Sequence, residues 1–329
     1  MRARRGPARR NSAASRPAGS IGAVQAPACL VALLLLVLGS ACAGQAARAP
    51  AGSVVQEAQL PARERGVWEH YHAGGAAWEL DRERVLADPA LGRFVVDNLV
   101  REMVASYDRS RLARSGERAG PFERAQAELV VLAPLSTPVL VELVGVRDGI
   151  VSFLGADLLA RIGAPALHPL LAKLGDPQAE VRRRAAELFA RLPRGASSAE
   201  EAQVGEALAK LVRSDSAWIV RAQAARTLGA RGARDAHKGF AAGVLTRALS
   251  DTDAAVVESA ASALRELAEP RAVPLLVDAL ERSLAAGDLA AARAAQESLR
   301  SLTGYKRDLL PQEWRRWWAD EGERATLAH

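Results

Sequence analysis

Two histidines two positions apart, His70 and His72, have a type and spacing that could bind a metal ion in this 329-residue chain. A His-x-His pair in an extended segment can direct two imidazole nitrogens at one ion, but a zinc site needs at least one further protein ligand. Nothing in the surrounding stretch WEHYHAGGAAW points to such a ligand. We therefore interpret both residues as surface histidines and predict no metal site.

The sequence patterns that mark common active sites are missing. The chain has no G-x-S-x-G, no H-E-x-x-H and no G-x-x-x-x-G-K motif. Its two cysteines, Cys29 and Cys42, both lie near the N-terminus, so the body of the chain has no thiol for a disulfide or for nucleophilic catalysis. Carboxylates alternate with arginines, which is typical of a solvated helix face. These observations predict a protein that is not an enzyme and needs no cofactor.

Charged residues on the stretches that follow each Ala-rich segment are candidates for binding a partner. Both signs occur among them, so they do not form the cationic track that a nucleic-acid backbone would need. We expect them to contact a protein or peptide, and the alternative is ordinary solvent-facing charge. The candidates are Glu142, Lys173, Arg213, Arg247 and Arg282.

Three tryptophans near the C-terminus form a second candidate surface. Trp314, Trp317 and Trp318 are spaced i, i+3, i+4 behind Pro311, which suits the first turn of a helix. Indoles on one helix face could be a ridge that a partner binds. The interpretation we favour is that they cover the apolar flank of the preceding helices as a C-terminal cap.

The elements that must position these residues repeat along the chain. The pattern is clearest where a valine is followed by small residues at plus four and plus five and an apolar residue at plus eight, with an Asp at minus five. Offsets of four and eight stay on one side of a helix, and the Asp suits a helix cap or the turn before it. The three clearest copies are Val181 with Ala185, Ala186, Phe189 and Asp176; Val220 with Ala224, Ala225, Leu228 and Asp215; and Val256 with Ala260, Ala261, Leu264 and Asp251.

Equivalent positions recur at 121, 151, 181, 220, 256 and 291. Periods of about 20–50 residues with two helices per unit indicate an α-solenoid. A Pro-apolar-apolar pattern opens several predicted second helices, at Pro138, Pro169 and Pro274. Longer loops are expected at 194–201 and 231–240.

The repeated residues from Pro121 to Leu302 resemble the HEAT-repeat family, including its bacterial branch related to phycobilin lyases. The resemblance implies an all-α solenoid of five to six helical hairpins, with helical caps at both ends. It also brings two enzyme alternatives, a HEAT-like lyase and a HEAT-like DNA glycosylase. The lyase is disfavoured because an exported chain would rarely meet a bilin apoprotein, and the glycosylase because no basic groove is evident.

The N-terminal segment explains the net charge of +6. Residues 1–41 hold six arginines and no acidic residue, and beyond them basic and acidic residues balance. A basic start, the short apolar run up to Leu38 and a break of small residues predict a secretory signal. The box LGSAC, Leu38 to Cys42, resembles a bacterial lipoprotein signal, which implies that Cys42 is lipidated. The alternatives are ordinary cleavage after Ala43, giving a periplasmic or secreted protein, and an uncleaved anchor.

The expected organisation is a signal segment at 1–41, a flexible tether at 42–62, an N-terminal helical cap at 63–120, HEAT-like repeats at 121–303 and a Trp-rich cap at 304–329. The predicted function is a non-catalytic, membrane-anchored scaffold of the cell envelope. It would bind a protein or peptide on the concave face of the solenoid and would not bind nucleic acid. The alternative is a structural envelope spacer without a ligand.

Overall fold

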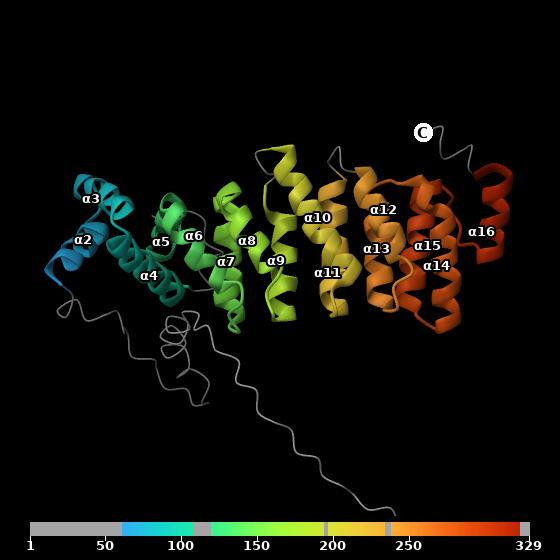
Figure 1. Ribbon diagram of the computed structural model, residues 1–329, viewed down its shortest axis with the longest axis horizontal. Coiled ribbons are helices and arrows are strands. Elements are labelled where there is room, and N and C mark those ends of the chain that lie inside the picture. The colour runs from blue at the N-terminus through green and yellow to red at the C-terminus, as the bar shows by residue number, and fades with distance from the viewer. Residues whose placement is uncertain (1–60, 108–119, 194–196, 234–237, 323–329) are drawn as a thin grey trace, which may run out of the picture. The chain divides into compact units, whose positions relative to one another are not determined.

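The computed structural model describes residues 61–107, 120–193, 197–233 and 238–322, and every regular element in these ranges is helical (Figure 1). All of them belong to one compact unit. The helices before the repeats are α2 (Ala62–Ala73), α3 (Ala76–Ala87) and α4 (Pro89–Ser106). The first helices of successive units are α5 (Pro121–Val131), α7 (Gly149–Ile162), α9 (Ala179–Arg191), α11 (Trp218–Gly232), α13 (Ala254–Glu266) and α15 (Leu289–Thr303). The second helices are α6 (Ala133–Leu143), α8 (Leu167–Lys173), α10 (Ser198–Ser214), α12 (Lys238–Ala248), α14 (Val273–Ala286) and α16 (Pro311–Trp317). Three short helical segments adjoin α8, α14 and α16: η4 (Ala164–Ala166), η5 (Pro270–Ala272) and η6 (Trp318–Gly322).

The predicted all-α solenoid of helical hairpins is confirmed. Each strong copy of the repeat lies on a first helix, and its anchor and small residues are buried; Ala224 and Ala260 have no exposed surface. Helix α11 packs against both α9 and α13, and α13 packs against α15. Each unit therefore buries its apolar side against its neighbours, as a stack of hairpins requires.

Small residues set how closely the first helices approach. A Cβ added at Gly229 of α11 would lie 2.5 Å from the Cβ and 2.9 Å from the Cα of Ala263 on α13. Real side-chain atoms do not approach so closely, so the two helix backbones meet here only because one residue has no side chain. Gly229 and Ala263, which lie outside the plus-four and plus-five positions of the repeat, thus form a contact point between units.

The repeated Asp shapes the turn before each first helix. Asp176, Asp215 and Asp251 each accept a hydrogen bond from the backbone N–H two residues later, at 2.9 Å in all three cases. This is the Asx-turn arrangement. Of the two roles that the sequence allowed, the turn is the one observed, and the direct cap of α13 is Asp253, which accepts from the N–H of Ala255.

Three local predictions differ from the structure. Pro138 lies in the interior of α6, and the proline in the first turn of that helix is Pro134. The expected loop at 194–201 is shorter, because Ser197 and Glu200 form a capping box that starts α10 at Ser198. The expected loop at 231–240 is also shorter, since α11 runs through Gly232 and α12 begins at Lys238; the residues at 194–196 and 234–237 lie outside the described ranges.

Asp88 caps α4 by accepting hydrogen bonds from the N–H groups of Ala90 and Leu91, at 2.9 and 3.1 Å.

Among the described helices, none alone has the length and hydropathy to cross a membrane; α5 and α6 would qualify only as a pair bent by 113°.

Candidate functional site

The predicted binding residues lie on the second helices, and two of them are in contact. Lys173 of α8 donates a hydrogen bond to Glu142 of α6 at 2.8 Å, and its ammonium lies 3.9 Å from Asp176. Glu142 remains 57% exposed in this pair. Neighbouring units therefore present opposite charges side by side.

The other three candidates do not converge with that pair. Arg213 of α10 reaches Glu206 of its own helix at 3.5 Å. Arg247 is exposed on α12, and no ion pair to it is found among the described residues. Arg282 of α14 donates to the backbone carbonyl of Leu249 at 3.0 Å, so it joins consecutive units. The five residues form a dispersed charged surface and not a single pocket.

The tryptophans divide between core and surface. Trp314 is completely buried, and its indole N–H donates to the side-chain oxygen of Gln296 on α15 at 3.3 Å. Its ring lies 5.7 Å from that of Tyr305 and 5.8 Å from that of Trp317. Trp317 and Trp318 are half-buried. Trp314 therefore covers the end of the stack, which leaves only its two neighbours partly open to solvent.

The two histidines of the His-x-His pair bind different carboxylates. His70 Nδ1 lies 2.6 Å from Asp81, and His72 Nε2 lies 3.6 Å from Glu102. Both are on helix α2, where residues two apart point in different directions. Within the described residues, no group of three or more His, Cys, Asp or Glu side chains is placed to hold a metal ion. Their contacts attach α2 to α3 and α4.

Burial raises the pKa of two groups beside these histidines. Burial raises the pKa of Glu102, although His72, the Tyr71 hydroxyl and Arg124 all favour its charged form. Burial also raises the pKa of Tyr71, which donates to Glu102 at 3.3 Å, and the carboxylate adds to that shift. Tyr71 is packed between Trp68 and Trp78. The polar contacts of this cluster join α2 to α4, as expected of a helical cap.

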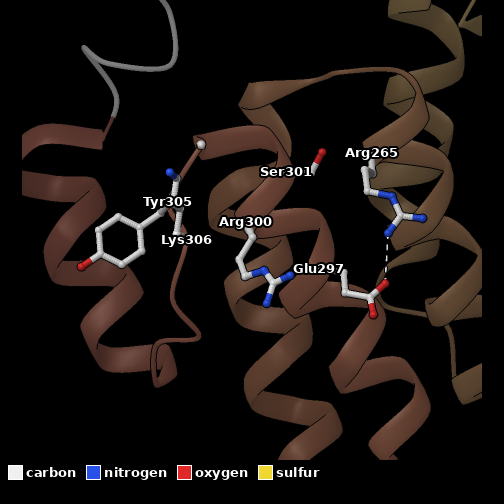
Figure 2. Close-up of a pocket in the computed structure, with 7 residues that line it drawn as sticks. Arg265, Glu297, Arg300, Ser301, Tyr305 and Lys306 are labelled. Carbon is white, nitrogen blue, oxygen red and sulfur yellow. Dashed lines mark hydrogen bonds and ion pairs between the residues drawn. The ribbon is translucent and has the colours of Figure 1, made fainter.

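A hollow that the sequence did not predict lies between α13, α15 and the segment after α15 (Figure 2). We call it the α13–α15 hollow, and its volume is about 520 Å³. The ring of Tyr305 points away from the other side chains and packs on α16. The lining residues are Arg265, Glu297, Arg300, Ser301, Gly304, Tyr305 and Lys306.

Positive charge exceeds negative charge in the α13–α15 hollow. Its carboxylate, Glu297, is held by Arg293 at 2.9 Å and by Arg265 at 3.1 Å, and these arginines lower its pKa. Arg300 lies 3.2 Å from the exposed Asp308. Lys306 is exposed, and no hydrogen bond or ion pair of its side chain is found among the described residues. The hollow thus has cationic groups with capacity for a further anion.

A second hollow, of about 310 Å³, lies on the other side of α13. We call it the α11–α13 hollow. Its cation, Arg226, donates to the Ser259 hydroxyl at 3.1 Å, and its two carboxylates are Glu258 and Glu266. The lining residues are Ala190, Gln223, Arg226, Thr227, Ala230, Glu258, Ser259, Ser262, Ala263 and Glu266. The two hollows therefore differ in the sign of their excess charge.

Sequence reasoning missed both hollows because it sought binding residues on the second helices. Small and short polar residues at outward positions of the first helices, such as Ser262 and Ser301, were the signal that could have located them. Cys42, the signal segment at 1–41 and the tether up to residue 60 lie outside the described residues, as do residues 108–119.

Stacked helical hairpins with buried small residues on the first helices define an α-solenoid. Residues 205–300 match the family model of HEAT repeats. The matched part of the chain, from α10 to α15, therefore consists of HEAT repeats. No curated protein matches it in sequence.

Solved structures similar to the chain include engineered and natural proteins. One engineered protein is 21% identical, with a TM-score of 0.38, covering 68% of this chain and 97% of its own. Another is 22% identical, with a TM-score of 0.39 and coverages of 68% and 99%. The karyopherin Kap121p, solved with the extreme C-terminus of the protein phosphatase Cdc14p, is 13% identical, with a TM-score of 0.40 and coverages of 74% and 28%.

Proposed function

We propose that this HEAT-repeat protein is a non-catalytic scaffold that binds a protein or peptide partner. The observation that carries the proposal is the contact between charged side chains of consecutive second helices in the Glu142–Lys173 pair, together with exposed charges on later second helices such as Arg247. A stack of hairpins that pack on each other fixes the backbones that carry such side chains before binding, which lowers the ordering cost. An extended chain segment is the kind of ligand that can contact several units at once.

The proposal extends to the location of the protein. We infer that the chain is exported and tethered to a membrane of the cell envelope through a lipid on Cys42. The support is the sequence alone: a basic start, a short apolar run and the box LGSAC. Cleavage after Ala43, which would leave a soluble periplasmic or secreted protein, is the alternative.

Charge reversal on the second helices tests the scaffold. Arg213 and Arg247 suit this because neither is bound to another unit in the structure. The full chain would carry a photo-crosslinker and be exposed to envelope extract, beside the double variant Arg213→Glu/Arg247→Glu. We expect the native chain to capture a defined partner that the variant loses.

Arg271→Glu is the matched control, because Arg271 is an exposed arginine of η5 and not of a second helix. It should retain the partner. If the native chain captures nothing above background, the spacer alternative replaces the scaffold.

The lipid tether has a separate test. Cells grown with radioactive palmitate should label the native chain, and Cys42→Ala should abolish the label. Undiminished labelling of the variant would contradict lipidation at Cys42.

A further inference from the structure

We propose that the α13–α15 hollow binds the Asp and Glu carboxylates of an acidic segment of a partner protein. The inference rests on the proposed scaffold function and assigns the chemistry of one binding position. The proposed binding position lies in the layer of first helices, where both hollows occur, and not on the second helices.

Charge in the hollow favours an anionic ligand. Arg265, Arg300 and Lys306 line it together with one carboxylate, Glu297. Since Glu297 already has two arginine partners, it is not the group that neutralises Lys306. The excess of positive charge is local to the hollow, because beyond residue 41 the chain has equal numbers of basic and acidic residues.

The geometry suits a carboxylate. Arg300 and Lys306 line the hollow from α15 and from the segment after it, and in the view of Figure 2 Arg300 lies between Lys306 and the Glu297–Arg265 pair. A guanidinium binds a carboxylate through two parallel N–H donors, and an ammonium adds three donors of free orientation. The bond from Arg300 to Asp308 is 3.2 Å long, and Asp308 is 66% exposed, so an incoming carboxylate can compete with it.

A nucleic acid fits this surface less well than an acidic peptide. A phosphate backbone needs a continuous cationic track. On the other side of α13, the α11–α13 hollow offers Glu258 and Glu266 against the single Arg226. A polyanion that left the first hollow in that direction would meet repulsion, whereas a short acidic segment occupies the first hollow alone.

A fluorescent peptide of alternating Glu and Ser, titrated onto the full chain in detergent at low salt, tests the assignment. We expect saturable binding that weakens as salt rises, because exposed charges are screened. A peptide with Gln in place of Glu should not bind. Lys306→Glu should weaken binding about tenfold or more, since it removes one charge-assisted contact and adds a repulsive one.

Two further variants test whether the effect depends on the positive charge at position 306. Lys306→Arg preserves the charge and should bind as the native chain does. Arg271→Glu reverses an exposed charge outside the hollow and should have no effect. Equal binding of the Gln peptide, or unchanged binding by Lys306→Glu, would overturn the assignment. So would a tighter complex with a single-stranded oligonucleotide that Lys306→Glu abolishes.

The outcome separates this inference from the scaffold proposal. If the acidic peptide fails to bind while the extract partner is still captured and still lost on charge reversal of Arg213 and Arg247, the scaffold stands and the acidic site does not. If no extract partner is captured either, the scaffold proposal fails as well.

Discussion

Arg221 of α11 donates two hydrogen bonds to Asp251, each 2.8 Å long, and Asp251 precedes the first helix of the next unit. The same arginine donates to the carbonyl of Asp215 at 2.9 Å, within its own turn. Arg182 repeats the arrangement one unit earlier, with bonds of 2.7 and 2.8 Å to Asp215. A guanidinium thus joins the turn of its own unit to the turn of the next.

Asp251→Asn should destabilise the junction between these units. Burial alone would raise the pKa of Asp251, but the hydrogen bonds from Arg221 and from the N–H of Asp253 outweigh it and lower the pKa. Removing the charge leaves a mostly buried guanidinium without its counter-ion, at a cost of about 1–3 kcal/mol in the free energy of unfolding. Urea unfolding measures this.

Asp278→Asn is the matched control for that change, because Asp278 pairs with Arg315 on the exposed surface. Exposed pairs contribute little, so we expect no measurable change. Equal effects of the two substitutions would contradict a special role for the Arg221–Asp251 pair.

Gly229→Ala should separate α11 from α13. The added Cβ would collide with Ala263, and the contact involves backbone as well as side chain, so neither helix can yield easily. We expect a loss of about 1–3 kcal/mol in the free energy of unfolding. Gly243→Ala is the control, because a Cβ at this helical position meets nothing within 4 Å. It should stabilise by about 0.5–1 kcal/mol, since alanine favours helix over glycine. Destabilisation by both would indicate that the close contact is not the cause.

The stability of α9 should depend on pH through Glu180. Hydrogen bonds from Arg183, opposed by partial burial and reinforced by Arg184, lower its pKa from 4.5 to about 2. A carboxyl group whose pKa is lowered by folding stabilises the folded state above its unfolded pKa, and that contribution disappears as the pH falls. The difference in melting temperature between the native chain and Glu180→Gln should therefore shrink between pH 4.5 and about 2. A difference independent of pH would show that the ion pairs are not its source.

Trp314→Ala should open the C-terminal end of the stack. The substitution removes a completely buried indole that contacts Tyr305 and Trp317, at a cost of about 3–5 kcal/mol. Because each unit depends on its neighbours, hydrogen exchange should increase first in α15 and α16. Trp318→Ala, at a half-buried position, should have a much smaller effect. If Trp314→Ala left exchange in α15 unchanged, the cap role would be wrong.

The sequence by itself determined the helices and their order in pairs. Val220, Ala224 and Leu228 recur with helical spacing, and this local periodicity is legible without knowing what packs on it. It also predicted the C-terminal helix that begins at Pro311. The capping box of Ser197 and Glu200 is also present in the sequence, but residues 194–201 were predicted to be a loop.

Only the tertiary structure decided which units each side chain joins. Asp251 meets Arg221 across 30 residues, and Arg265 meets Glu297 across 32, because the rotation between successive hairpins brings those turns and helix faces together. The stacking also forms the hollow beside Lys306 and places Arg282 against the backbone carbonyl of Leu249. A repeat pattern encodes each hairpin locally, whereas the angle between hairpins arises from packing of side chains that are distant in the chain.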